Sequence, residues 1–184
     1  MLVLFLDIDG VLNSHRWDDL WVGYTFEGLD HLPPKLRRNA CWLDHTAIYV
    51  LNDILERTGA NVVISSAWRH NYTLDELQAM LVVRGFQHAD RLIGMTPHLG
   101  HETRGDEIGA WLESTEHDVE GYLVLDDFCP DEFGDHADRL LQTSAGSGLR
   151  PYHVPLAVRM LCESATVMEA MRAEGWLDDD EEAT

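Results

Sequence analysis

The chain has 184 residues, which suits one domain with a buried core and is short for two ordinary domains. Apolar residues make up 45% of it and charged residues 25%, a balance typical of globular proteins. The 33 acidic residues outnumber 13 Lys and Arg, giving a formal net charge of −20. This charge argues against non-specific nucleic-acid binding and against docking on an anionic membrane.

The N-terminal region and the cysteines indicate the setting of the protein. Residues 2–6 are apolar, but Asp7 ends this run at once, and no stretch of the chain approaches the length of a membrane span. We therefore expect a cytoplasmic protein with no membrane segment. Cys41, Cys129 and Cys162 are widely spaced and form no C-x-x-C pair, so we expect reduced, packed thiols.

Short apolar runs alternate with helical patterns along the chain. In chain order, we predict a strand at 2–6, a helix at 44–58, a strand at 61–65, a helix at 73–84, a strand at 91–93, a helix at 104–116, strands at 122–125 and 139–142, and a helix at 155–174. Thr73 with Glu76 is a capping box for the second of these helices. Strands that alternate with helices imply parallel pairing, so the predicted fold is a doubly wound α/β sheet.

Two segments do not follow this alternation. Residues 14–43 show no clear period, are rich in aromatic residues, and carry the basic cluster Lys35, Arg37 and Arg38. We expect this segment to be an irregular insertion that acts as a lid or binding loop. Residues 178–184 are mostly acidic, and we expect a disordered tail after a single domain at 1–177.

Polar residues follow three of the predicted strands. Asp7 and Asp9 follow the first strand, Ser65 ends the second, and Asp126 and Asp127 follow the strand at 122–125. Ligands of open α/β sheets bind beyond the carboxyl ends of the strands, so we expect these side chains to meet at one edge. Clustered carboxylates repel one another and, as hard oxygen ligands, favour Mg²⁺. The alternative is that these acids only cap helices and turns.

These residues also resemble a known family. Residues 4–12, Leu-Phe-Leu-Asp-Ile-Asp-Gly-Val-Leu, are similar to the first motif of the haloacid dehalogenase (HAD) superfamily, D-x-D-G-[TV]-[LI] after an apolar strand. The serine, basic and acidic-pair motifs follow in the family's order. The wider pattern is most similar to small HAD domains of RNA-repair and polynucleotide 3′-phosphatase proteins. The resemblance implies a three-layer, Rossmann-like (HAD-like) α/β fold with helices on both faces, a small cap insertion at 14–43, phosphatase activity and Mg²⁺ as cofactor.

The resemblance implies a role for each polar residue at the predicted edge. Asp7 is expected to be a Mg²⁺ ligand and the nucleophile, forming an aspartyl-phosphate that splits one difficult displacement into two easier steps. Asp9 is expected to protonate the leaving oxygen, to activate water, and to bind Mg²⁺ through its backbone carbonyl. Asp127 is expected to bind the metal directly, and Asp126 indirectly or through water. Ser65 is expected to hydrogen-bond a phosphoryl oxygen.

The cation that neutralises the phosphoryl group is usually a lysine in this family. The chain has a single lysine, Lys35, and it precedes the serine motif, so it is out of order. We therefore predict that Arg104 takes this role, because it opens a helix after the third strand and arginine can hold phosphate through two hydrogen bonds. Arg84 and Arg91 are the other candidates, and an arginine exposed at a helix start is the alternative.

Four cations are candidates for substrate binding: Arg69, Lys35, Arg37 and Arg38. Aromatic residues of the insertion can stack a base while the nearby cations hold phosphate. The alternatives are that the aromatic residues pack the insertion onto the body, that its cations are solvated, and that Arg69 is a surface residue.

The sequence thus predicts a Mg²⁺-dependent phosphomonoesterase that acts through an aspartyl-phosphate on a nucleic-acid 3′-phosphate or a nucleotide. A small phosphometabolite is the alternative substrate. A binding or regulatory module that keeps the HAD fold without catalysis is the alternative class, and the missing lysine favours it. A third alternative is a domain that works with a larger repair enzyme.

Overall fold

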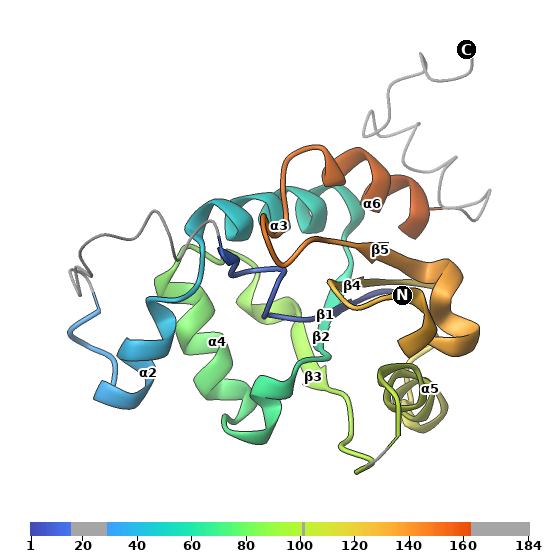
Figure 1. Cartoon of the computed structure of the whole chain (residues 1–184), viewed down its shortest axis with the longest axis horizontal. Coiled ribbons are helices and arrows are strands. Elements are labelled where there is room, and N and C mark those ends of the chain that lie inside the picture. Colours follow the sequence, from blue (N-terminus) through green and yellow to red (C-terminus); the bar gives the residue numbers. More distant parts are fainter. Residues whose placement is uncertain (16–28, 101, 163–184) are drawn as a thin grey trace.

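A computed structural model describes residues 1–15, 29–100 and 102–162 of the chain. Within these residues one parallel sheet is formed by β1 (Leu2–Leu6), β2 (Asn61–Ile64), β3 (Leu92–Met95), β4 (Gly121–Asp126) and β5 (Leu140–Gln142). The strand order is β3-β2-β1-β4-β5, which places the first strand in the middle of the sheet (Figure 1). The carboxyl ends of β2 and β4 therefore flank the end of β1.

Helices cover both faces of this sheet (Figure 1). The helices that share a core with one face are α2 (Pro34–Ala40), α3 (His45–Thr58), α4 (Leu74–Val83) and α6 (His153–Leu161). Because strand side chains alternate between faces, Leu4 of β1 enters this larger core, while Phe5 packs with Ile108 of α5 (Arg104–Ser114) on the opposite face. This arrangement confirms the predicted three-layer α/β fold.

The predicted element boundaries mostly agree with the structure to within two residues. Four short 3₁₀ helices complete the described elements: Ala67–His70 (η1), Ala89–Arg91 (η2), Pro130–Glu132 (η3) and Gly134–Arg139 (η4). Thr73 and Glu76 form the predicted capping box of α4. The last helix begins at His153, two residues before the predicted start, and the predicted part beyond residue 162 lies outside the described residues.

The prediction that residues 14–43 are irregular was wrong in part, because α2 forms within them. Pro33 precedes this helix and Pro34 begins it, where a missing backbone N–H costs nothing. Leu36 and Ala40 bury one side of α2 in the larger core. Residues 16–28 of the insertion and the acidic tail at 178–184 lie outside the described residues.

The thiols and the helix lengths bear on two further predictions. Cys41 and Cys162 are buried and form no disulfide, as predicted. Cys129 is also free of a disulfide, but it is exposed, so the prediction of a packed thiol was wrong for this residue. Among the described residues, no helix has the length and apolar character needed to cross a membrane.

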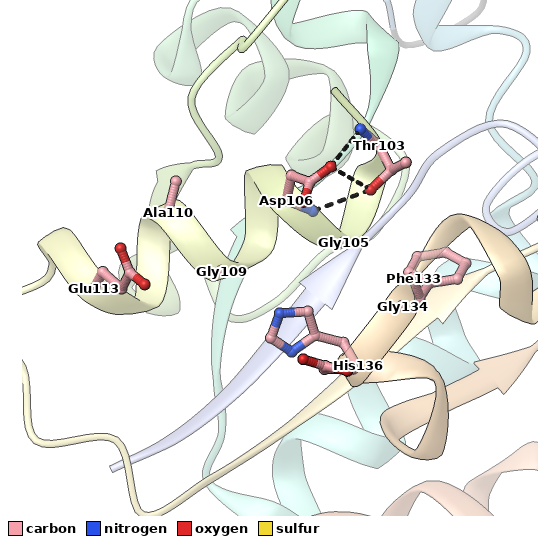
Figure 2. A pocket seen from close by; sticks show the side chains of 10 residues that line it. Thr103, Gly105, Asp106, Gly109, Ala110, Glu113, Phe133, Gly134 and His136 are labelled. Carbon is pink, nitrogen blue, oxygen red and sulfur yellow. Dashed lines mark hydrogen bonds between the residues drawn. The ribbon is translucent and has the colours of Figure 1, made fainter. Parts of the chain in front are cut away.

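The start of α5 lies against the segment that follows β4. Thr103 and Asp106 form a capping box whose hydrogen bonds fix the first turn of α5 (Figure 2). A Cβ atom on Gly105 would overlap the backbone carbonyl of Phe133, so glycine is what lets the two segments come this close. A pocket between α5 and η4 adjoins this contact and is lined in part by Glu113 and His136 (Figure 2).

Candidate active site

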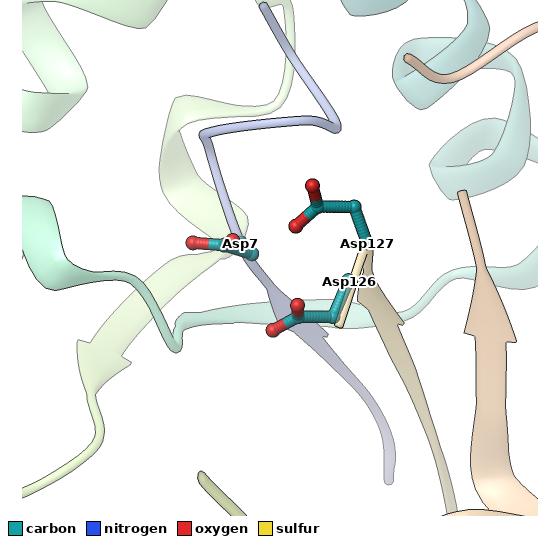
Figure 3. A group of neighbouring side chains, drawn as sticks. All are labelled: Asp7, Asp126 and Asp127. Atoms are coloured by element: carbon teal, nitrogen blue, oxygen red, sulfur yellow. The ribbon is translucent and has the colours of Figure 1, made fainter. Parts of the chain in front are cut away.

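Three carboxylates meet at the carboxyl edge of the sheet. Asp7 follows β1, Asp126 ends β4 and Asp127 comes next, and one oxygen atom from each lies within 4.8 Å of the other two (Figure 3). The parallel pairing of β1 with β4 causes this meeting, because the Asp7 amide continues the ladder by donating to the carbonyl of Leu125 at 2.9 Å. The structure therefore brings together the acids of two motifs that lie far apart in the sequence.

Burial makes this meeting of charges unfavourable in the absence of a cation. The Asp7 residue is 4% exposed, and burial, with the nearby charge of Asp126, raises its pKa from 3.8 to about 7. Burial also raises the pKa of Asp126 to about 6, and it raises the pKa of Asp127. Arg104 opposes all three shifts but does not cancel them.

The donor set fits a hard divalent cation. Oδ1 of Asp126 accepts a hydrogen bond from the Phe128 amide at 2.9 Å, but its buried Oδ2 atom has no hydrogen-bond partner among the described residues. Nε of Arg104 lies 3.7 Å from this atom, too far for a hydrogen bond. A buried carboxylate oxygen without a hydrogen bond is costly, and a metal ion would satisfy it. The three carboxylates offer only oxygen ligands, the type that Mg²⁺ prefers.

The turn after β1 needs glycine to admit this cluster. Gly10 has a φ of +71°, a conformation that L-residues rarely adopt, and a Cβ atom there would overlap the carboxylate of Asp127. The Gly10 amide donates to Oδ1 of Asn13 at 2.9 Å, and its carbonyl accepts from the hydroxyl of Thr143 at 2.8 Å. The turn is thus fixed from both sides in a shape that leaves room for Asp127.

Asp9 is an exposed residue, and it lies close enough to the cluster for its charge to raise the pKa of Asp127. Its Oδ1 atom accepts a hydrogen bond from Nδ2 of Asn13 at 2.6 Å, and its Oδ2 atom accepts one from Nε1 of Trp68 at 2.9 Å. The sequence analysis predicted no role for Trp68. The one signal that could have singled it out is its place three residues after Ser65.

The two serines after β2, Ser65 and Ser66, differ in the hydrogen bonds that their hydroxyl groups form. Ser65 is buried, and its hydroxyl has no hydrogen-bond partner among the described residues, so it can serve an added ligand. Ser66 accepts a hydrogen bond from the Trp68 amide at 3.4 Å and is the N-cap of η1. A hydrogen bond from the Ser66 side chain also lowers the pKa of Asp7, a contact that sequence reasoning missed.

Arg104 is the arginine that reaches the acidic cluster. Its side chain is 9% exposed, its Nε atom lies 3.7 Å from Oδ2 of Asp126, and its guanidinium donates to the carbonyl of Ser65. The other two candidates serve elsewhere: Arg84 donates to the carbonyl of Leu43, and Arg91 donates to the carbonyl of Leu55. Of the three candidate arginines, Arg104 is therefore the one whose contacts lie at the acidic cluster, and its contact with a phosphoryl group stays a prediction.

The candidate substrate-binding cations have protein partners of their own. The Arg69 side chain is 5% exposed, and its guanidinium forms an ion pair with Glu107 of α5 and donates to the carbonyl of Ser66 at 2.7 Å. Glu107 also lies 3.5 Å from Nδ1 of His98. Arg69 therefore ties the loop after β2 to α5, and its contact with substrate stays a prediction.

The basic cluster of α2 is divided among different neighbours. Nζ of Lys35 donates to the carbonyl of Asn71 at 2.8 Å and lies 4.5 Å from the ring centre of Tyr72. Arg37 pairs with Asp30 at 3.2 Å, whereas Arg38 is exposed. Lys35 is the member of this cluster that contacts the segment following the serine motif.

Comparison with known proteins gives the family. A family model described as the HAD domain in Swiss Army Knife RNA repair proteins matches residues 3–154. This span runs from β1 into α6 and includes every candidate catalytic residue. The comparisons with curated proteins and with solved structures found no match. The chain therefore belongs to the family of HAD domains found in Swiss Army Knife RNA repair proteins, as its motifs predicted.

Proposed function

We propose that the protein is a Mg²⁺-dependent phosphomonoesterase that acts through an aspartyl-phosphate on Asp7. Membership of this HAD family implies a phosphatase-type hydrolase, and HAD proteins generally use Mg²⁺. The observation that carries the proposal is the group of carboxylates from Asp7, Asp126 and Asp127, with Arg104 beside it. Such an arrangement suits the transfer of a highly charged phosphoryl group.

The carboxylates of Asp7, Asp126 and Asp127, with the backbone carbonyl of Asp9, are the residues that would hold the metal. A bound Mg²⁺ supplies positive charge that offsets the repulsion between the phosphoryl oxygens and these acids. Arg104 adds a second positive charge next to Asp126. This arginine does the work that lysine usually does in the family, and its donors can hold two phosphoryl oxygens.

The proposed reaction has two displacements. In the first, a carboxylate oxygen of Asp7 attacks phosphorus, the bond from phosphorus to the leaving oxygen breaks, and that oxygen takes a proton from Asp9. In the second, ionised Asp9 takes a proton from water as the water oxygen attacks phosphorus. The bond to Asp7 breaks, phosphate leaves, and Asp9 is protonated again.

The contacts of Asp7 support its role as nucleophile. Attack requires the ionised carboxylate, and burial alone disfavours that form. The charge of Arg104 and the hydrogen bond from Ser66 both lower the pKa of Asp7 and so favour the reactive form. The unpartnered hydroxyl of Ser65 is available to donate to a phosphoryl oxygen at the same edge.

A nucleic-acid 3′-phosphate or a nucleotide is the proposed substrate. The RNA-repair family supports this class, and the site has an exposed aromatic residue, Phe128, whose ring centre lies 5.5 Å from the guanidinium of Arg104. Lys35, Arg37, Arg38 and Arg69 stay as proposed substrate-binding residues. With a net charge of −20, binding has to be local to the site, since the chain offers little positive charge elsewhere.

The test is a phosphatase assay with and without Mg²⁺ on a 3′-phosphorylated oligonucleotide, nucleotides and a panel of sugar phosphates. We expect hydrolysis that needs Mg²⁺, that is fastest on the oligonucleotide or a nucleotide, and that is lost in Asp7→Asn. Asp75→Asn, which alters an exposed acid in the first turn of α4, is the matched control and should keep full activity.

Three outcomes would overturn parts of the proposal. Undiminished hydrolysis by Asp7→Asn excludes the aspartyl-phosphate. Faster turnover of sugar phosphates assigns a small phosphometabolite instead of a nucleic-acid end. Mg²⁺ binding without turnover of any phosphate monoester identifies a non-catalytic HAD-fold module, the class that the missing lysine favours.

A further inference from the structure

The environment of Asp9 assigns a role to an aromatic residue that the HAD motifs leave unexplained. We infer that Trp68 is a positioning residue, which orients the carboxyl group of Asp9 for proton transfer to the leaving oxygen. This inference rests on the proposed phosphatase function. In that reaction, Trp68 would be the hydrogen-bond donor that orients Asp9, the proposed general acid.

Two donors from different parts of the chain hold the Asp9 carboxylate. Trp68 donates from Nε1 to Oδ2 at 2.9 Å, and Asn13 donates from Nδ2 to Oδ1 at 2.6 Å. An exposed aspartate would otherwise sample several rotamers. Asn13 is itself fixed, because its Oδ1 atom accepts the Gly10 amide at 2.9 Å. The carboxyl plane of Asp9 is therefore set by the turn after β1 and by η1 together.

Both partners of Asp9 are donors at the atoms that face it. An indole N–H cannot accept a proton, and the amide nitrogen of Asn13 cannot either. Neither partner can therefore engage the proton of a neutral Asp9 carboxyl group. That proton stays free for a substrate oxygen, while the two hydrogen bonds keep the group in place. Donors to both oxygens favour the ionised carboxylate, the form in which Asp9 takes a proton from water in the second displacement, and they hold the group in one orientation for both proton transfers.

Trp68 is in turn supported by the insertion. Its ring centre lies 5.7 Å from that of Tyr72, and Tyr72 shares a hydrogen bond with Asn39 of α2. Nζ of Lys35 lies 4.5 Å from the Tyr72 ring centre and also donates to the carbonyl of Asn71 at 2.8 Å. The series of contacts runs from α2 through Tyr72 and Trp68 to Asp9. The contacts of Lys35 therefore hold the Tyr72 ring that lies beside Trp68.

The test uses the dependence of rate on the leaving group. Proton donation matters for an alkoxide, which leaves poorly, and matters little for 4-nitrophenolate, which leaves readily without a proton. Trp68→Phe keeps an aromatic ring next to Tyr72 but removes the N–H donor. We expect kcat/KM for an alkyl phosphate to fall at least about tenfold, part of the roughly 10²- to 10⁴-fold that a general acid contributes. The rate on 4-nitrophenyl phosphate should change by less than about twofold.

The matched control is Trp111→Phe. Trp111 packs at 5.4 Å against Phe5 on the opposite face of the sheet, so its loss should leave the ratio of the two rates unchanged. In an Asp9→Asn background, Trp68→Phe should cause no further loss on the alkyl phosphate, because the two residues act through one group.

A spectroscopic measurement keeps the inference testable even where a variant folds poorly. The indole N–H resonance of Trp68, assigned in the wild-type protein, should shift in Asp9→Asn and stay in place in Asp75→Asn. Equal losses on both substrates, no loss on either, or an unmoved resonance would overturn the inference. Absence of turnover by the wild-type enzyme on both substrates would instead contradict the proposed function itself, so the two failures are distinguishable.

Discussion

Charged residues have different partners at the two edges of the sheet. At the amino edge, Arg57 pairs with Asp53 at 2.8 Å within the last turns of α3, and Arg91 donates to the carbonyl of Leu55 near the end of the same helix. At the carboxyl edge, three carboxylates lie close together, those of Asp7, Asp126 and Asp127, and Arg104 is the cation beside them. The charged side chains at the amino edge pair with each other or with a carbonyl at the end of α3 and stabilise this helix. The carboxylates at the carboxyl edge instead repel one another. Like charges that the fold holds close together despite their repulsion therefore indicate the candidate site.

The largest expected effect is a loss of turnover when an acid at the carboxyl edge is replaced, compared with an acid at the amino edge. Asp127→Asn should lower Mg²⁺-dependent turnover by about 10³-fold, since bound metal supplies several kcal/mol of charge stabilisation in the transition state. Asp53→Asn, at the amino edge, should leave turnover unchanged. Steady-state rates and calorimetric Mg²⁺ titrations of both variants check this, and equal Mg²⁺ affinity in the two would contradict the metal site.

The next effect separates arginines at the two edges. Arg104→Ala should lower kcat by roughly 10²-fold, the scale measured when one donor to a developing charge is lost. Arg104→Lys should keep more activity than Arg104→Ala, because it restores the cation usual in the family. Arg91→Lys should have wild-type kcat. A kcat of Arg104→Ala equal to that of wild type would remove this arginine from the proposed reaction.

A third comparison uses two glycines of similar conformation. Gly10 has a φ of +71° at the carboxyl edge, and Gly59 has a φ of +67° at the amino edge. An alanine at either position costs about 1 kcal/mol or more of stability through backbone strain. A Cβ atom at Gly59 meets no neighbouring atom, whereas one at Gly10 overlaps Asp127.

Gly10→Ala should therefore lose Mg²⁺ binding as well as stability, and Gly59→Ala should lose stability alone. Thermal melts combined with Mg²⁺ titrations measure both quantities. Mg²⁺ binding by Gly10→Ala with wild-type affinity would show that the turn tolerates a side chain next to Asp127.

The smallest expected effect is on the pH dependence of stability. The pKa of Asp7 is about 7 in the folded protein against an ordinary 3.8, and that of Asp126 is about 6. The folded state thus binds more protons than the unfolded state between these values. The free energy of unfolding of the metal-free protein should fall as pH rises from 3.8 to about 7 through Asp7.

Mg²⁺ added above pH 7 should recover this loss and raise Tm, because the ion binds the folded state and compensates the buried charges. Asp126→Asn should flatten the pH profile of Tm, whereas Asp53→Asn should preserve it. A Tm that rises with pH over this window would contradict the burial of uncompensated acids.

The sequence was sufficient for features that follow from topology. Parallel strands end at a common edge, so the meeting of Asp7 with Asp126 could be predicted from the motif positions alone. The place of Arg104 at the start of a helix was also predicted, and helix α5 begins at this residue. These are properties of the chain path and need no knowledge of side-chain partners.

Side-chain partners between distant elements could not be predicted in this way. Glu107 has the pattern of a solvated acid in the first turn of a helix, and only the packing of α5 on the loop after β2 pairs it with Arg69. The contact of Trp68 with Asp9 depends likewise on how η1 packs beside the first turn. Helix α2 was missed because it is too short for its period to be seen between irregular neighbours.

The central place of β1 in the strand order also has a consequence for biosynthesis. Asp7 leaves the ribosome well before the neighbouring strand that carries Asp126, because more than 100 residues separate the two in the sequence. Contacts between segments this far apart in the sequence form slowly, because closing the long loop between them costs chain entropy. A nascent or truncated chain that lacks β4 therefore displays Asp7 without Asp126 and Asp127, two of the four proposed metal ligands, so under the proposed mechanism it should show no turnover until the sheet is complete.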